Sequence, residues 1–161
     1  GGIHAWLQEG LTLEKTSATV NDPIEATKVK LSINEDVMAS REYIEAKLDD
    51  PNTVIWDARS PEEFYGYKLF SMRGGHIPGA INYEWTKAMD PDKGYRIRQG
   101  IEQELEASGI SKDKEIITHC QGHHRSGFTY MVAKALGYEN IRAYDGSWSE
   151  WGNLLDTPIE V

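Results

Sequence analysis

The chain has 161 residues, of which 39% are hydrophobic and 27% are charged, and its formal net charge is -9. This length fits one domain of ordinary size and excludes two full catalytic domains. The acidity argues against nucleic acid or an anionic membrane surface as the main partner, because both require clustered positive charge. No apolar run is long enough to span a bilayer. A single cysteine excludes an internal disulfide, so its thiol is either inert and buried or reactive.

The first ten residues predict a short helix and a turn, and a polar segment without periodicity follows through Pro23. We expect residues 1–25 to be the tail of a preceding domain plus a linker, and residues 26–161 to form one domain. A weak internal repeat is consistent with this division, because the residues around Trp151 align with the residues around Trp6 at one constant difference in residue number.

After this segment, short β-rich runs alternate with helical stretches, which is the pattern of parallel βαβ units. The predicted fold class is therefore α/β, with a mainly parallel sheet of about five strands and helices on both faces. Strands are expected at residues 28–31, 53–57, 80–83, 115–119 and 141–144.

The expected helices have recognisable ends. Asn34 is placed to cap a helix that runs toward Leu48. The run Ser60-Pro61-Glu62-Glu63 combines an N-cap serine, a proline at the first helical position and a glutamate at the third, which is a capping box. The longest helix should end before Gly137, which occupies the position where a left-handed residue is favoured. Further helices are expected over residues 100–107 and 125–136.

Residues 119–127, with the sequence HCQGHHRSG, are expected to form the functional centre. Cys120 follows a predicted strand at its carboxyl end, where ligands of open α/β sheets bind, and it precedes a helix N-terminus. Unpaired backbone N–H groups and the helix dipole favour the thiolate, so the pKa should fall below about 8.5. With the Arg125 guanidinium they can hold an oxyanion, and Gly122 permits the tight turn.

In these residues the chain resembles the rhodanese superfamily, and the resemblance covers about residues 28–161. Asp57-Ala-Arg59 followed by Glu63 looks like the first signature of the family, and residues 75–80 look like the second. Residues 145–151 are similar to the stretch that closes many thiosulfate sulfurtransferase domains. The motifs occur in the family's order, and as a set they are highly specific.

The resemblance implies that Cys120 carries sulfur as a persulfide and that Arg125 binds the sulfonate of the donor. Arg59 is expected to form a buried ion pair with Glu63 or to bind the backbone of the active loop. The substrate-binding loop would consist of Gln121, Gly122, His123, His124 and Ser126. Structural support is expected from Asp57, Arg59, Glu63, His76 and Trp148.

The implied function is transfer of a sulfane sulfur from thiosulfate, or a similar donor, to cyanide or a thiol. The alternative is a persulfide relay or binding module without turnover. A cysteine-dependent phosphatase or arsenate reductase is disfavoured, because phosphatases space the loop as H-C-x-x-x-x-x-R and Arg125 lies one position short of that, with Ser126 in its place. The loop also lacks the Gly-Ser-Gly-Val-Thr run typical of mercaptopyruvate enzymes, which disfavours 3-mercaptopyruvate as donor.

No cofactor and no metal are predicted. His119, Cys120, His123 and His124 are close in sequence, but adjacent loop residues rarely converge on one tetrahedral centre. The expected partners are the sulfur donor and the thiol or cyanide acceptor, with no nucleic acid and no membrane, and an upstream rhodanese domain would be a further contact. The cellular compartment stays open between cytoplasm and periplasm.

Overall fold

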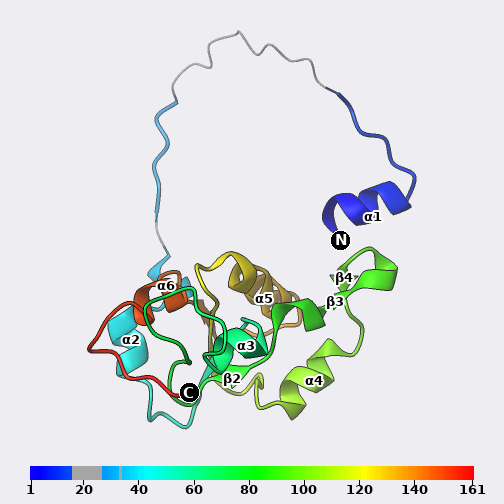
Figure 1. Ribbon diagram of the computed structural model, residues 1–161. Helices are drawn as coiled ribbons and strands as arrows, with labels where there is room; N and C mark the ends of the chain where they lie inside the picture. Colours follow the sequence, from blue (N-terminus) through cyan, green and yellow to red (C-terminus); the bar gives the residue numbers. More distant parts are fainter. Residues whose placement is uncertain (16–26, 33) are drawn as a thin grey trace.

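A computed structural model describes residues 1–15, 27–32 and 34–161 of the chain. Its centre is a four-stranded parallel sheet in the order β2-β1-β5-β6, and β3 and β4 form a separate antiparallel pair (Figure 1). This arrangement confirms the predicted α/β fold class. The strands are β1 (Thr53–Asp57), β2 (Ile81–Asn82), β3 (Met89–Asp90), β4 (Arg96–Ile97), β5 (Glu115–His119) and β6 (Ile141–Ala143).

Helices lie on both faces of the sheet (Figure 1). None of those in the described part of the chain is long and apolar enough to cross a membrane. The α-helices are α1 (Gly2–Gln8), α2 (Arg41–Glu45), α3 (Pro61–Phe64), α4 (Ile101–Ala107), α5 (His124–Ala135) and α6 (Ser147–Trp151), and the 3-10 helices are η1 (Glu35–Val37), η2 (Trp85–Ala88) and η3 (Pro91–Lys93).

The expected strand at residues 28–31 is wrong. These residues form no strand, and the side chains of Val29 and Leu31 are 70% and 83% exposed. The outer edge of β6 is instead met by Met38, which forms a parallel bridge with Ala143. A short apolar alternation predicts a strand only where a sheet edge and a buried face are available, and here another segment takes that edge.

The helix expected from Asn34 toward Leu48 is divided in two. Asn34 caps η1, accepting a hydrogen bond from the N–H of Asp36 at 3.1 Å. The chain is then extended, and Ser40 caps α2 by accepting from the N–H of Tyr43 at 3.2 Å. The interruption is the segment that bridges to β6, so pairing with the sheet overrides local helix preference.

Two other predicted helix ends are confirmed. The Ser60 hydroxyl accepts from the N–H of Glu63, and the Glu63 carboxylate accepts from the N–H of Ser60 at 3.1 Å, which is a complete capping box. The chain leaves α5 through Gly137, whose φ of +88° lies in the left-handed region. The capping box fixes the position of the Glu63 carboxylate, which belongs to the site described below.

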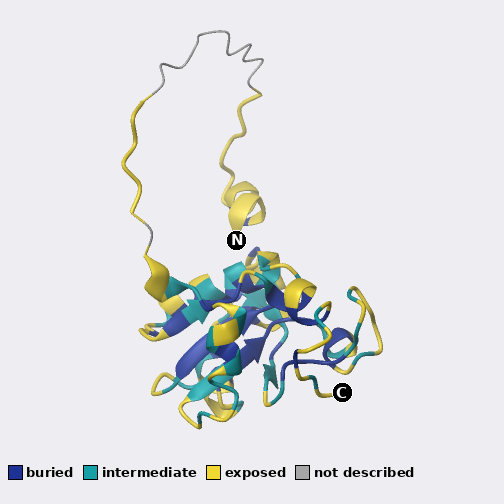
Figure 2. Ribbon diagram, turned by 90° about the vertical axis from the view of Figure 1, so that its left-hand side faces the viewer, coloured by how far each residue is buried: buried dark blue, intermediate teal, exposed yellow. Residues whose placement is uncertain are grey.

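Two hydrophobic cores cover the two faces of the sheet, as the buried centre in Figure 2 shows. Alternate residues of each strand point to opposite faces, so Trp56 and Ile116 enter one core while Ile55 and Ile117 enter the other. The first core is completed by α4 and α5, and the second by α2 and α6. Both faces are thereby covered, and the polar residues gather at the carboxyl edge of the strands.

Candidate active site

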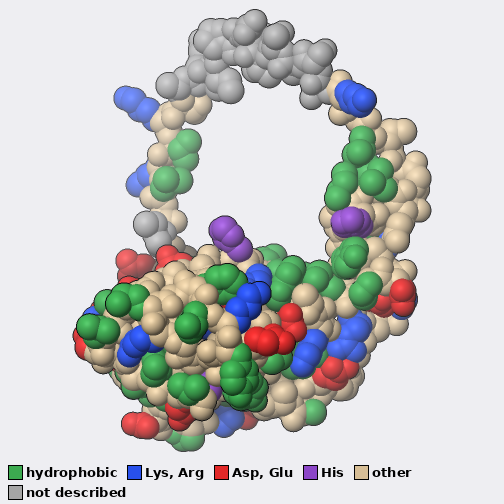
Figure 3. Space-filling view, viewed as in Figure 1, with side chains coloured by type: hydrophobic (Ala, Val, Ile, Leu, Met, Phe, Trp, Pro, Cys, Tyr) green, Lys and Arg blue, Asp and Glu red, His purple; other side chains and the backbone are tan. Residues whose placement is uncertain are grey.

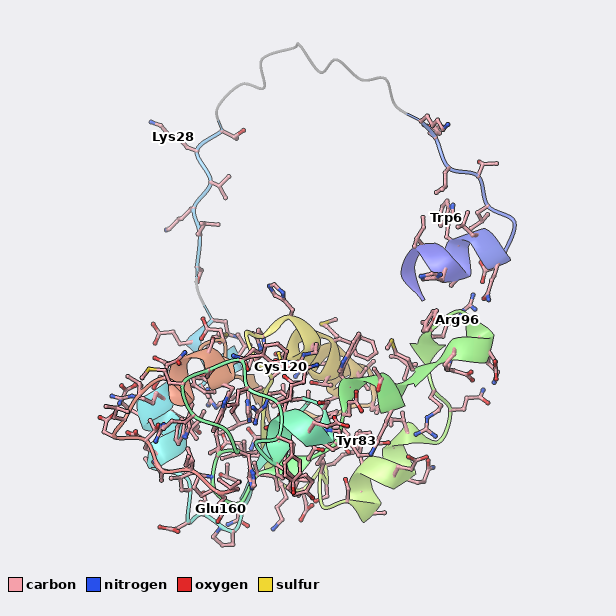
Figure 4. All side chains as sticks on the ribbon, in the orientation of Figure 1. Trp6, Lys28, Tyr83, Arg96, Cys120 and Glu160 are labelled. Atoms are coloured by element: carbon pink, nitrogen blue, oxygen red, sulfur yellow. The ribbon has the colours of Figure 1, made fainter. Side chains whose placement is uncertain are left out.

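Cys120 lies at the carboxyl edge of the sheet, directly after β5 and just before α5 (Figure 4). The register of the two central strands pairs Asp57 with His119, so β1 and β5 end at the same level. Every residue of β5 is buried, and Cys120 itself is only 1% exposed. The structure therefore places the thiol at the strand-to-helix corner that the sequence indicated.

Hydrogen-bond donors converge on the Cys120 sulfur. Burial alone would raise the pKa of this thiol, but the Ser126 hydroxyl and the backbone N–H groups of Ser126, Gly122 and Arg125 donate to the sulfur and lower its pKa below the ordinary value. These groups together favour the charged form of the thiol.

The start of α6 holds the active loop in place from the other side. The N–H of Trp148 donates to the Cys120 carbonyl at 3.0 Å, and the N–H of Ser149 donates to the Gln121 carbonyl at 2.8 Å. The Ser147 hydroxyl accepts from the N–H of Cys120 at 3.4 Å. These hydrogen bonds between α6 and the loop were not predicted. The sequence showed the motif around Trp148, but it did not show that this motif contacts the loop.

Arg125 forms a bidentate ion pair with Glu63. Its Nη1 and Nη2 atoms donate to the two carboxylate oxygens at 2.6 and 2.7 Å. The hydrogen bond with Glu63 raises the pKa of Arg125, to which the nearby Cys120 also contributes. Burial alone would raise the pKa of Glu63, but the Arg125 hydrogen bond, the N–H of Ser60 and the charges of Arg125 and Arg59 together lower it below its ordinary value. The carboxylate thus balances the charge of Arg125, which lies near Cys120.

The predicted ion pair between Arg59 and Glu63 is wrong. Arg59 instead pairs with Asp57, with Nη2 2.5 Å from Oδ2, and donates to the Gly75 carbonyl at 2.8 Å. Its guanidinium also lies 4.5 Å from the centre of the Trp148 ring. Arg59 and Asp57 are both almost fully buried. The pair therefore connects the end of β1 with the Gly75 carbonyl and with the Trp148 ring at the start of α6.

His119 is fully buried between the loop and this ion pair. Its Nδ1 lies 3.2 Å from the Cys120 carbonyl, and its Nε2 lies 3.5 Å from the Asp57 carboxylate without a hydrogen bond. Burial lowers the pKa of His119, which favours the neutral ring. Burial alone would raise the pKa of Asp57, but the charge and the hydrogen bonds of the Arg59 guanidinium help to hold it below its ordinary value.

The two histidines of the loop differ in their surroundings. His123 is half-buried, has a left-handed backbone with φ of 61°, and places Nδ1 2.8 Å from the Ser126 hydroxyl oxygen. His124 is exposed. Gln121 points away from the sulfur: its Nε2 donates to the Phe70 carbonyl at 3.3 Å and to the Ser71 hydroxyl at 3.0 Å.

His76 is not part of the loop. Its Nδ1 lies 3.0 Å from the Phe64 carbonyl, and its ring stacks on the Phe64 ring at 3.6 Å. Its backbone exchanges hydrogen bonds with Glu160, which lies well away from Cys120 in Figure 4. His76 therefore joins the end of α3 to the C-terminal segment, whereas Glu63 and Trp148 contact residues of the active loop directly.

Figure 3 shows Lys and Arg side chains beside Asp and Glu side chains on the face of the molecule that is seen in Figure 1, with no broad patch of one sign. Within the residues that the structure places, no cluster of three or more His, Cys, Asp or Glu side chains could hold a metal ion.

The fold and the site thus define an α/β domain with a buried cysteine at the carboxyl edge of a parallel sheet, whose thiol has a lowered pKa. Residues 40–154 match the protein family described as Rhodanese-like domain. The chain belongs to this family, which confirms the resemblance seen in its motifs.

Curated relatives extend over the whole chain. It is 49% identical to the thiosulfate sulfurtransferase of Pseudomonas aeruginosa and 51% identical to that of Azotobacter vinelandii. It is 34% identical to the sulfur carrier protein TtuD of Thermus thermophilus, with 99% of the chain aligned. The chain spans 58% of the length of the first two relatives and 59% of the third.

Solved structures support the fold. A variant of EanB in complex with ergothioneine aligns with a TM-score of 0.84 at 22% identity, covering 97% of this chain and 39% of that one. The anaerobic ergothioneine biosynthesis enzyme from Chlorobium limicola aligns with a TM-score of 0.72 at 24% identity, covering 78% of this chain and 32% of that one. At these identities the likeness concerns the architecture of the domain.

Proposed function

We propose that the chain is a thiosulfate sulfurtransferase that carries the transferred sulfur as a persulfide on Cys120. The observation that carries the proposal is the set of four donors on the Cys120 sulfur, which lowers its pKa. The two relatives at about half identity, both thiosulfate sulfurtransferases, support the same reaction. Thiosulfate and a thiol or cyanide acceptor are the proposed substrates.

In the first half-reaction the Cys120 thiolate attacks the outer sulfur of thiosulfate. A bond forms between the two sulfurs, the sulfur–sulfur bond of thiosulfate breaks, and sulfite leaves with the electron pair. In the second, cyanide or a thiolate takes the outer sulfur and the Cys120 thiolate is the leaving group. The loop N–H groups stabilise the anionic sulfur in both steps.

Arg125 is proposed to bind the sulfonate of the donor. Its bidentate contact with Glu63 uses two of the five N–H donors of a guanidinium, which leaves others for Cys120 and for an incoming anion. Since Glu63 balances its charge, Arg125 would act on the sulfonate mainly through oriented hydrogen bonds and less through a net positive charge. Gln121 is proposed to hold the loop rather than the substrate, because its amide N–H groups are used by Phe70 and Ser71.

Two alternatives are less favoured. A persulfide relay without turnover has some support from the relative named as a sulfur carrier protein, but that relative is only 34% identical. A phosphatase or arsenate reductase would need the longer loop, and Arg125 lies at the fifth position after Cys120. Neither alternative matches the names of the two more similar relatives.

The proposal is tested by sulfur loading and turnover. After incubation with thiosulfate, the intact mass of the chain should increase by one sulfur atom, and cyanide should then release thiocyanate and restore the original mass. Cys120→Ser should abolish both signals while its circular dichroism stays unchanged. Loading only from a persulfidated protein would support the relay, and hydrolysis of an aryl phosphate at a comparable rate would support the phosphatase.

We further propose that residues 26–161 form the sulfurtransferase domain and that residues 1–25 are a tail and linker outside it. The apolar side chains of the first helix support this division, because Ile3, Trp6 and Leu7 are each about half exposed. An upstream rhodanese domain would be the natural contact for these side chains.

A further inference from the structure

The Ser126 hydroxyl lies between the Cys120 sulfur and the His123 ring. Ser126 is fully buried, its side chain donates to the sulfur, and its oxygen is 2.8 Å from Nδ1 of His123. The three side chains therefore form a continuous chain of hydrogen bonds from sulfur to oxygen to nitrogen. All three belong to residues 120–126, so the folding of one loop brings them together.

Counting protons fixes the direction of this chain. A hydroxyl has one proton, and a thiolate can only accept a hydrogen bond. When the Ser126 hydroxyl donates to the charged sulfur, its contact with His123 is a hydrogen bond only if Nδ1 of His123 carries a proton. With Nδ1 bare, Ser126 would donate to His123 and turn its lone pairs toward the sulfur.

The surroundings of His123 favour a neutral ring with a single proton. Burial lowers its pKa, the Asp145 carboxylate opposes this effect, and the neighbouring His124 adds to it. A neutral imidazole has two tautomers, and the hydrogen bond that the ring makes selects between them. Here the selecting partner is Ser126, which is itself oriented by the Cys120 thiolate.

The backbone at this position is the one that glycine or asparagine adopts most readily. The φ of His123 is 61°, in the left-handed region, where a side chain with a Cβ is disfavoured. A histidine at this position accepts that cost while its ring contacts Ser126. The position thus offers two informative replacements: alanine, which removes the donor, and asparagine, which tolerates the backbone and keeps a side-chain N–H.

We propose that His123 is a positioning residue for sulfur transfer, whose Nδ1–H orients the Ser126 hydroxyl toward the Cys120 sulfur. The inference rests on the proposed function, in which the thiolate is the nucleophile of one half-reaction and the leaving group of the other. Hydrogen bonds in series strengthen one another, so the His123 ring increases the stabilisation that Ser126 gives to the sulfur. His123 acts on the sulfur through Ser126 and does not bind the donor.

The tautomer of His123 is measured directly by NMR on the chain labelled with ¹⁵N-histidine. At a pH where Cys120 is a thiolate, His123 should carry its proton on Nδ1, and its signal is assigned as the one that His123→Asn removes. Alkylation of Cys120 with iodoacetamide removes the thiolate, so the Nδ1–H form should then lose its preference. A ring protonated on Nε2 in the untreated chain would overturn the proposal, whatever the variants do.

The pKa of the thiol gives a second readout, from the pH dependence of the alkylation rate of the only cysteine in the chain. Ser126→Ala should raise the midpoint by about one pH unit, because it removes a hydrogen bond to a charged group. His123→Ala should raise the midpoint by about 0.3 pH units, because it removes only the strengthening that the His123 ring gives to the hydrogen bond from Ser126 to the sulfur. His123→Asn should bring the midpoint most of the way back to its value in the natural chain. His124→Ala, which removes an exposed neighbouring ring, should move the midpoint less.

Equal midpoints in His123→Ala and His124→Ala, with both variants folded by circular dichroism, would contradict the role of His123. Neither measurement uses thiosulfate. Absence of thiocyanate formation would therefore count against the proposed function alone, while an unchanged thiol and an Nε2–H ring would count against the inference alone. If His123→Ala does not fold, the tautomer in the unmodified chain still decides.

Discussion

At the scale of single residues, the Glu63 carboxylate balances the positive charge of Arg125 in the absence of substrate. Glu63 is 3% exposed and is held by its own capping box, so its carboxylate cannot turn away without breaking the start of α3. The pair places a guanidinium beside the Cys120 sulfur but supplies little net positive charge. Stabilisation of the thiolate then depends mainly on the short-range donors of the loop.

The variant Glu63→Gln separates these two effects. It keeps the shape of the side chain but leaves Arg125 uncompensated, so the alkylation midpoint of Cys120 should move to lower pH. The free energy of unfolding should fall by about 1–2 kcal/mol, less than for a fully buried pair, since the Arg125 side chain is 26% exposed. Urea unfolding and the pH dependence of alkylation measure the two quantities.

The sign of the pH effect follows from the lowered pKa of Glu63. Its contribution to stability is complete above its ordinary value of 4.5 and is lost as the pH falls through its lower value in the folded chain. The difference in stability between the natural chain and Glu63→Gln should therefore shrink on acidification. If the pH midpoint of Cys120 alkylation rises in Glu63→Gln, Glu63 acts mainly by holding Arg125 in position.

At the scale of elements, the active loop is supported by the first turn of α6. Ser147 has a left-handed backbone with φ of 53°, and its hydroxyl donates to the Tyr144 carbonyl at 2.9 Å while accepting from the N–H of Cys120. The N–H groups of the next two residues bind the loop carbonyls. The end of β6 and the end of β5 are thus connected through one serine.

Substitutions of Ser147 test whether its backbone is strained. Ser147→Ala and Ser147→Gly both remove the hydroxyl, but only glycine adopts the left-handed backbone without steric cost. The alanine variant should therefore be less stable than the glycine variant by about 1 kcal/mol, as measured by urea unfolding. Equal stabilities would show that the backbone relaxes around position 147 and that the contacts of α6 with the active loop do not hold it in the left-handed conformation.

The sequence was sufficient for elements whose pattern is local. The central strands at 53–57 and 115–119 are continuous β-rich runs, and the capping box at Ser60 is a four-residue motif; both are found where they were predicted. The strand expected at 28–31 failed because its alternation needs a free sheet edge, which Met38 occupies. Whether a segment pairs with a distant strand is set by the whole fold.

The same distinction applies to the candidate site. The position of Cys120 before a helix was readable, because it depends only on the order of a strand, a loop and a helix. The partner of Arg59 was not, since the choice between Asp57 and Glu63 depends on how α3 is oriented against β1. The left-handed backbone of Ser147 is also invisible in a sequence, because serine rarely adopts it.

At the scale of the whole molecule, the first helix is peripheral. In Figure 2, residues 1–15 are almost entirely exposed, and Ala5 is the one buried residue of α1. The helix touches the β3–β4 pair through the edge of the His4 ring on Tyr95, at 5.0 Å, and through an exposed ion pair between Glu9 and Arg96. These contacts lie on the opposite side of β4 from the sheet that holds Cys120 (Figure 4).

A chain that consists of residues 26–161 should therefore keep its stability and its chemistry. An exposed ion pair contributes about 0–1 kcal/mol, and one aromatic edge contact adds a similar amount, so the free energy of unfolding should change by no more than about 1–2 kcal/mol. Sulfur loading of Cys120 by thiosulfate should be unchanged. Urea unfolding and intact mass, measured beside Glu9→Gln in the full chain to isolate the ion pair, give both values. A loss of loading in the shortened chain would mean that the first 25 residues belong to the catalytic domain, because the surface contacts of α1 alone cannot reach the loop that holds the sulfur.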